Sequence, residues 1–123
     1  PALTLGADSA SVTAIAQSIG ISEIFSRQLR ALGQAGDILL CINSSTGTDN
    51  LLLAVKTAQE RNMGIVMMSN TKDSEIGSLM RPEDAELRVD ATQSARIVEI
   101  HTMVIHHFCE LIDHTLFGTY NRD

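Results

Sequence analysis

Residues 37–70 read DILLCINSSTGTDNLLLAVKTAQERNMGIVMMSN, and this stretch decides the fold class. The short apolar runs Asp37 to Ile42 and Gly64 to Ser69 have the length and composition of strands buried on both faces of a sheet. Between them, residues 49–62 repeat apolar side chains at intervals of three and four, which predicts a helix. Two buried strands joined through a helix by short connections are typical of a parallel pair, and therefore of an α/β protein.

The rest of the chain repeats this alternation of strand and helix patterns. Two further strands are expected, at Ala2 to Leu5 and at the less apolar run Ala85 to Val89. Helical periodicity covers residues 11–19, 22–32, 73–80 and 93–117. Because 123 residues is the length of one domain, we expect residues 1–123 to form a single α/β layer sandwich with a parallel sheet.

The composition excludes several classes of function. The formal net charge is −6 and the nine Lys and Arg residues are scattered, so direct binding of nucleic acid is not expected. No apolar segment approaches the roughly 20 residues that cross a bilayer, so no membrane association is expected. Cys41 and Cys109 match no metal-ligand spacing, and we expect both to be buried thiols of a cytoplasmic protein.

A cluster of hydroxyl and amide side chains follows the predicted strand 37–42. Asn43, Ser44, Ser45, Thr46 and Thr48 stand where a parallel strand leads into a helix, and ligands of open α/β sheets bind at this edge. Short donors and a helix N-terminus suit a phosphate group, although the segment is neither a nucleotide P-loop nor a dinucleotide fingerprint. The alternative is a turn that ends in a helix cap, and spacing alone does not separate the two.

The last predicted helix carries the second group of chemically active side chains. His107, Glu110 and His114 recur at intervals of three and four, which fits either a divalent metal site or a solvated helix face. His106 points in another direction, and is either an interface histidine or an acid, base or ligand that reaches a pocket. The helix also has a broad apolar face, which predicts either a subunit interface or core packing: Ile97, His101, Val104, Ile105, Phe108, Leu111 and Ile112.

Two longer stretches carry a resemblance to a known family. The segments RQLRALGQAGD, at residues 27–37, and SARIVEIHTMVIHHFCELIDHTLF, at residues 94–117, resemble the SIS (sugar isomerase) domain family. The similarity is to its phosphoheptose isomerase branch, and still more to its branch of DnaA initiator-associating proteins. It implies a three-layer flavodoxin-like fold with a five-stranded parallel sheet, assembled as a homotetramer. It also implies that residues 1–123 are the C-terminal two-thirds of one SIS domain, without the family's N-terminal helices and first strand.

The resemblance assigns roles to individual residues. Asn43, Ser44, Ser45 and Thr48 align with the family's phosphate loop and are implied to bind the phosphate of a sugar phosphate. Ser18 takes the place of a substrate-facing carboxylate, and it is implied to lie at the sugar site.

Two positions on the last helix bear on catalysis and on zinc. His106 occupies the position of the family's catalytic histidine, which is also a zinc ligand, whereas Val98 replaces a glutamine of the catalytic and zinc site. Because Val98 can neither coordinate a metal nor form a hydrogen bond, no cofactor is expected, and zinc is expected only if the chain is an isomerase.

These losses lead to an expectation about function. We expect a non-catalytic tetrameric scaffold that promotes assembly of DnaA at the replication origin and keeps a pocket resembling a sugar-phosphate site. The alternative is a phosphoheptose isomerase that converts sedoheptulose 7-phosphate to D-glycero-D-manno-heptose 7-phosphate, an aldose-ketose isomerisation in which His106 is an acid or base. A sugar-phosphate sensor with neither activity is the third possibility.

Overall fold

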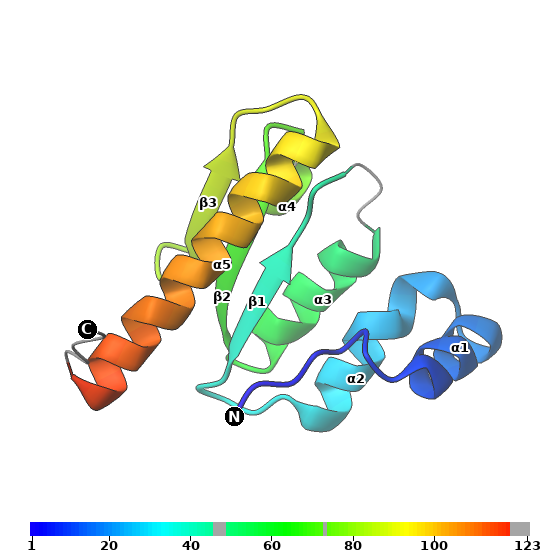
Figure 1. Cartoon of the computed structure of the whole chain (residues 1–123). Coiled ribbons are helices and arrows are strands. Elements are labelled where there is room, and N and C mark those ends of the chain that lie inside the picture. The colour runs from blue at the N-terminus through cyan, green and yellow to red at the C-terminus, as the bar shows by residue number, and fades with distance from the viewer. Residues whose placement is uncertain (46–48, 73, 119–123) are drawn as a thin grey trace.

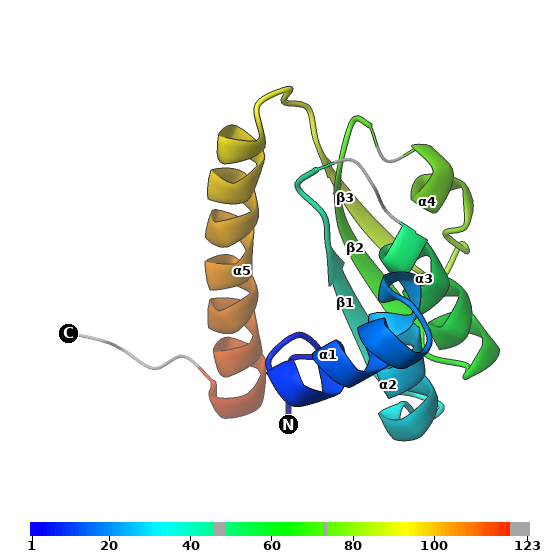
Figure 2. The ribbon, with the colours of Figure 1, turned by 90° about the vertical axis from the view of Figure 1, so that its right-hand side faces the viewer.

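The computed structural model has three layers and describes residues 1–45, 49–72 and 74–118. In chain order the elements are α1 (Ser9–Ser18), the short 3-10 helix η1 (Ile21–Glu23), α2 (Ile24–Leu32), β1 (Ile38–Ile42), α3 (Asp49–Glu60), β2 (Gly64–Asn70), α4 (Ser74–Ser78), β3 (Ala85–Val89) and α5 (Ser94–Phe117). Figures 1 and 2 show α5 on one face of the sheet and α2, α3 and α4 on the other. This arrangement confirms the predicted α/β class with a parallel sheet.

The sheet places the ends of its strands at one edge. Its order is β1-β2-β3 and both pairings are parallel. Ile42 is paired with Met68, and Asn70 is paired with Val89. The segments that leave β1 and β2 therefore start next to each other, as the predicted ligand edge requires.

The main core lies between the sheet and the helices α2 and α3. Cys41, Ile65 and Met67 alternate inward from β1 and β2, as expected for strands that are covered by helices. Leu29 from α2 and Val55 from α3 pack against them, and Val55 and Met67 are 0% exposed. Buried side chains of this size contribute about 1.5–3 kcal/mol each, so this layer holds the described part of the chain together.

The opposite face of the sheet is covered less completely. Of the residues of α5, only Ile97 and His101 are buried. Large apolar side chains remain exposed along α5 and on one side of β1: Val98, Met103, Leu111, Ile112, Leu116, Phe117, Ile38, Leu40 and Ile42. The prediction that Cys109 is buried is wrong, because it lies on this uncovered helix, whereas Cys41 is buried as predicted.

The prediction of a strand at Ala2 to Leu5 is also wrong. Residues 1–4 have no regular structure, and a turn follows in which Ala7 N donates to Thr4 O at 3.3 Å. A strand needs a neighbour for its backbone groups, and β1 is paired only with β2 in the described sheet. A groove of about 800 Å³ separates the 1–6 segment from β1, and Leu5 O instead accepts a hydrogen bond from Gln28 Nε2 at 2.7 Å.

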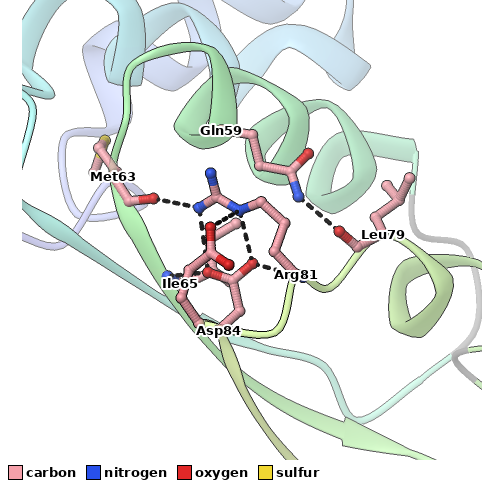
Figure 3. A network of polar contacts seen from close by, with 7 residues as sticks. Gln59, Met63, Ile65, Leu79, Arg81 and Asp84 are labelled. Atoms are coloured by element: carbon pink, nitrogen blue, oxygen red, sulfur yellow. Dashed lines mark hydrogen bonds and ion pairs between the residues drawn. The ribbon is translucent and has the colours of Figure 1, made fainter.

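A polar clamp ties the start of β2 to the connection between α4 and β3 (Figure 3). The enclosed carboxylate of Asp84 accepts hydrogen bonds from Arg81 Nε at 3.1 Å and from Ile65 N at 3.1 Å. Arg81 also donates to Met63 O at 2.8 Å, which joins the connection to the turn before β2. Burial acts to raise the pKa of Asp84, but the hydrogen bonds and the charge of Arg81 outweigh it and hold this pKa below its usual range.

A further hydrogen bond belongs to the same clamp. Gln59 of α3 donates from Nε2 to Leu79 O at 2.7 Å (Figure 3). The clamp lies at the amino ends of the strands, because Ile65 is the second residue of β2 and Asp84 immediately precedes β3. It is therefore remote from the edge at which a ligand is expected.

No described helix is both long enough and apolar enough to cross a membrane.

Candidate functional site

The candidate site begins with Asn43, the first residue after β1. Its backbone N–H donates to Met68 O at 2.9 Å, which extends the ladder between β1 and β2 by one bond. Its buried side chain then turns the chain: Nδ2 donates to Ser45 O at 3.0 Å, and Oδ1 accepts from Ser45 N at 3.3 Å. Asparagine favours this local arrangement because its amide substitutes for a backbone peptide group in a turn.

A second buried asparagine meets this turn from the neighbouring strand. Asn70 ends β2 and is 1% exposed. Its Nδ2 lies 3.3 Å from Asn43 O and 3.5 Å from Ser45 O, and its Oδ1 accepts from Lys72 N at 2.9 Å. Sequence reasoning missed Asn70, although its position at the end of an apolar run, at the same edge as Asn43, was a usable signal.

Two serines of the predicted phosphate loop lie in this turn. Ser44 is half-buried and Ser45 is exposed. Among the hydrogen bonds of the described residues, none uses the hydroxyl of either serine, so both hydroxyls are available to a ligand. Thr48, the third predicted hydroxyl, lies outside the described residues, as do Thr46 and Gly47.

The charges next to these serines have opposite effects on an anion. Helix α3 begins at Asp49, and a helix N-terminus favours an anion. The carboxylate of Asp49 in this first turn opposes that effect, while Lys72 adds an exposed cation just beyond β2. A phosphate here would therefore depend on the serine hydroxyls and on backbone N–H groups as well as on charge.

Ser18 belongs to a different element from these residues. It is the last residue of α1, its side chain is exposed, and its hydroxyl donates to Ala14 O at 2.7 Å within the same helix. No hydrogen bond described for the chain joins Ser18 to Ser44 or Ser45. Its predicted role at the sugar site stays a prediction.

The histidine of α5 that reaches the sheet is His101, not His106. His101 is 2% exposed, and its Nε2 lies 3.1 Å from Ser69 O. A carbonyl can only accept, so Nε2 carries the hydrogen, and Nδ1 is buried without a partner in the described structure. His106 is exposed, and five residues of helix place it about 7.5 Å further along the axis from the level of Ser69.

The predicted metal pattern on α5 fits a solvated face. His107 Nδ1 lies 3.7 Å from Glu110 Oε2, and both side chains are largely exposed. Among the described residues, no three His, Cys, Asp or Glu side chains gather closely enough to hold a metal ion. Val98, at the position where the resemblance expects a zinc-site glutamine, offers no donor atom. The described residues thus do not fit a zinc site.

Comparisons with known proteins agree with one another. No family model matches the chain. It is 44% identical over 119 residues to the phosphoheptose isomerase of Chromohalobacter salexigens, which covers 97% of this chain and 60% of that protein. It is 42% identical over 123 residues to the phosphoheptose isomerase of Alteromonas mediterranea, covering 100% of this chain and 62% of the relative. The chain therefore spans about three fifths of the length of these relatives.

Solved structures give the same result. Phosphoheptose isomerase GmhA from Neisseria gonorrhoeae superposes with a TM-score of 0.87 at 37% identity, covering 90% of this chain and 61% of that one. A phosphoheptose isomerase from Francisella tularensis superposes with a TM-score of 0.89 at 35% identity, covering 93% and 60% of the two chains. The shared fold confirms the predicted SIS-type architecture.

These relatives overturn the expectation of a non-catalytic scaffold for DnaA. That expectation rested on the polar side chains of the family that Val98 and Ser18 replace. Relatives at 42–44% identity over nearly the whole chain are named phosphoheptose isomerase, and nothing in the comparisons supports a DnaA partner. These replacements are local changes, because the remaining groups of a site can still position and protonate a substrate.

Proposed function

We propose that this chain, which belongs to the SIS domain superfamily and is a relative of the phosphoheptose isomerases, is itself part of a phosphoheptose isomerase. The observation that carries the proposal is identity of 42–44% to enzymes of that name over 96–100% of the chain. A second support is the polar edge of the sheet, where the serine hydroxyls of the loop after β1 are available to a phosphate. The proposed reaction is the interconversion of sedoheptulose 7-phosphate and D-glycero-D-manno-heptose 7-phosphate.

Different residues are proposed for phosphate binding and for proton transfer. Ser44 and Ser45 would donate their hydroxyls to the phosphate, with Asn43 fixing the turn that presents them and Thr48 as a further proposed donor. The isomerisation moves a proton between two adjacent carbons, so it needs an acid and a base close to the sugar. His106 is the group proposed for one of these proton transfers.

His106 is exposed on α5, and among the described residues no hydrogen bond joins it to Ser44 or Ser45, which favours an assembly. Helix α5 and one side of β1 expose a set of large apolar side chains, including Leu40 and Leu111. Apolar surface of this kind is typical of an interface. We therefore propose a homo-oligomer in which these surfaces are covered, and the tetramer implied by the resemblance is its expected form. No step is assigned to zinc, since the described side chains do not fit a zinc site.

The test is an isomerisation assay with sedoheptulose 7-phosphate on the wild-type protein and two histidine variants. His106→Ala is expected to lower kcat by about 10²–10⁴, the usual contribution of a general acid or base. His107→Ala is the matched control, because His107 is the next residue, is exposed and pairs only with Glu110 at 3.7 Å among the described ion pairs. Absence of turnover by the wild-type protein, or equal turnover by the His106→Ala variant, would contradict the proposal.

A further inference from the structure

The side chain of Asn70 joins two loops that are distant in sequence. It is a fully enclosed amide at the end of β2, and its Nδ2 donates across the edge of the sheet to Asn43 O at 3.3 Å, 27 residues earlier. It also reaches Ser45 O at 3.5 Å, a longer and weaker contact. A buried amide must find partners for its hydrogens, so this link is built into the folded state.

The same amide also holds the chain that follows β2. Its Oδ1 accepts from Lys72 N at 2.9 Å, so one side chain fixes the backbone on both sides of the edge. On the β1 side, the Asn43 side chain holds both the N–H and the carbonyl of Ser45. The backbone at Ser45 is therefore held by two buried amides, whereas the hydroxyls of Ser44 and Ser45 remain unused by the described residues.

We propose that Asn70 is a positioning residue for phosphate binding by Ser44 and Ser45. The inference rests on the proposed function, since it takes the serine hydroxyls as donors to a phosphate monoester. The amide hydrogens of Asn70 are directed at backbone carbonyls, so it acts on the anion through the turn and not by touching it. Donors that are held in place before the ligand arrives bind more tightly, because less ordering is needed on binding.

The test measures the affinity for inorganic phosphate and for sedoheptulose 7-phosphate by titration calorimetry. Asn70→Ala removes both amide hydrogens, and the affinity is expected to fall by at least about tenfold, which corresponds to about 1.4 kcal/mol. Asn70→Asp keeps the shape and the acceptor for Lys72 N, but it cannot donate to the two carbonyls. It is expected to lose at least as much affinity, and it serves as a second variant if the alanine protein does not fold.

The matched control is Gln59→Ala. Gln59 also donates from a side-chain amide to a backbone carbonyl, that of Leu79 at 2.7 Å, but it belongs to the clamp remote from this edge. This variant is expected to lose stability and to keep the wild-type affinity for phosphate. In the isomerase assay, both Asn70 variants are expected to raise KM by at least about tenfold and to change kcat by less than about twofold, because only the binding of the phosphate is altered.

The outcomes separate this inference from the proposed function. Wild-type phosphate affinity in both Asn70 variants would overturn the inference and leave the isomerase proposal intact. An equal loss of affinity in Gln59→Ala would also overturn it, since the effect would then be one of general stability. A wild-type protein that isomerises the sugar but binds no inorganic phosphate would count against the inference alone. A wild-type protein that binds phosphate but does not isomerise the sugar would count against the proposed function. The difference in phosphate affinity between the wild type and the Asn70 variants would then still test the inference.

Discussion

Replacement of Asp84 tests whether the clamp beside the start of β2 supports the fold. The carboxylate of Asp84 accepts from the backbone N–H groups of Ile65 and Arg81, at 3.1 and 2.9 Å, and from the Arg81 guanidinium at 3.1 and 3.2 Å. Asp84→Ala leaves the buried N–H of Ile65 without a partner, at about 1–3 kcal/mol, and removes the charged acceptor as well. Arg81 is partly exposed and regains water, so we expect a total loss of about 2–4 kcal/mol.

The Asp84→Asn variant is a second test of the clamp. Both carboxylate oxygens of Asp84 accept from N–H groups, so the amide nitrogen of Asp84→Asn would face a donor in either orientation. We expect a loss of about 2 kcal/mol at pH 7. Glu83→Gln is the control, because Glu83 lies 3.3 Å from the same guanidinium but is largely exposed, and it should change the stability by less than about 0.5 kcal/mol.

The effect should also depend on pH in a defined direction. The pKa of Asp84 is lowered in the folded state by its hydrogen bonds with Arg81 and Ile65, which outweigh burial. Its contribution is therefore complete above the unfolded-state pKa, at about pH 4, and is lost as the pH falls through the folded-state pKa. The difference between wild type and Asp84→Asn should be constant from pH 7 to 5 and shrink below about pH 4.

Urea denaturation followed by circular dichroism gives the free energy of unfolding at each pH. Two results would refute the reasoning about the clamp. One is a loss below about 0.5 kcal/mol for both Asp84 variants at pH 7, which is the size of an ordinary surface substitution. The other is a difference between wild type and Asp84→Asn that grows as the solution becomes acidic, since the sign of the pKa change would then be reversed.

Three further substitutions test other parts of the fold by the same denaturation assay. His101→Phe keeps an aromatic ring but removes the hydrogen bond to Ser69 O, and should cost about 1–3 kcal/mol; an unchanged stability would mean that the contact does not anchor α5. Met67→Ala empties a side-chain site that is 0% exposed and should cost about 2–5 kcal/mol, whereas a loss below about 1 kcal/mol would argue against the core at this position. Gly33→Ala would place a methyl 2.7 Å from Met63 Sδ and 2.9 Å from a carbonyl oxygen of α2, so about 1–3 kcal/mol is expected from overpacking, and a neutral result would show that the helix end can shift.

The spacing of apolar residues predicted most of the helices and strands. Most of them bury one face, and the residues of a buried face recur at a fixed interval in the sequence. The run at Ala85 to Val89 became β3 with the same bounds, and the pattern at residues 93–117 became α5 with a start one residue later. The strand predicted at Ala2 to Leu5 does not form, and the reason is not visible in the local sequence. Its apolar composition suits a strand, but a strand also needs a paired neighbour, and no local pattern reports whether a neighbour is present.

The candidate site was predicted in part. Asn43, Ser44 and Ser45 could be named because they follow directly after a buried strand, where the edge of a parallel sheet must lie. Asn70 could not be paired with them, since its hydrogen bond to Asn43 O spans 27 residues and depends on the register of β1 with β2. Likewise, His101 and His106 are five residues apart on one helix, and only the packing of α5 on the sheet decides that His101 is the one that is buried.

By itself, the sequence determined the α/β class, the order of the helices and strands after the first six residues, and the edge of the sheet at which polar side chains gather. These follow from the spacing of apolar residues and from the rule that parallel strands end at the same edge. The tertiary structure decided which of those side chains meet, by setting the strand register and the level at which α5 crosses the sheet. It therefore decided that two buried asparagines hold the turn at Ser45, because contacts between distant segments depend on packing and are not encoded in any local pattern.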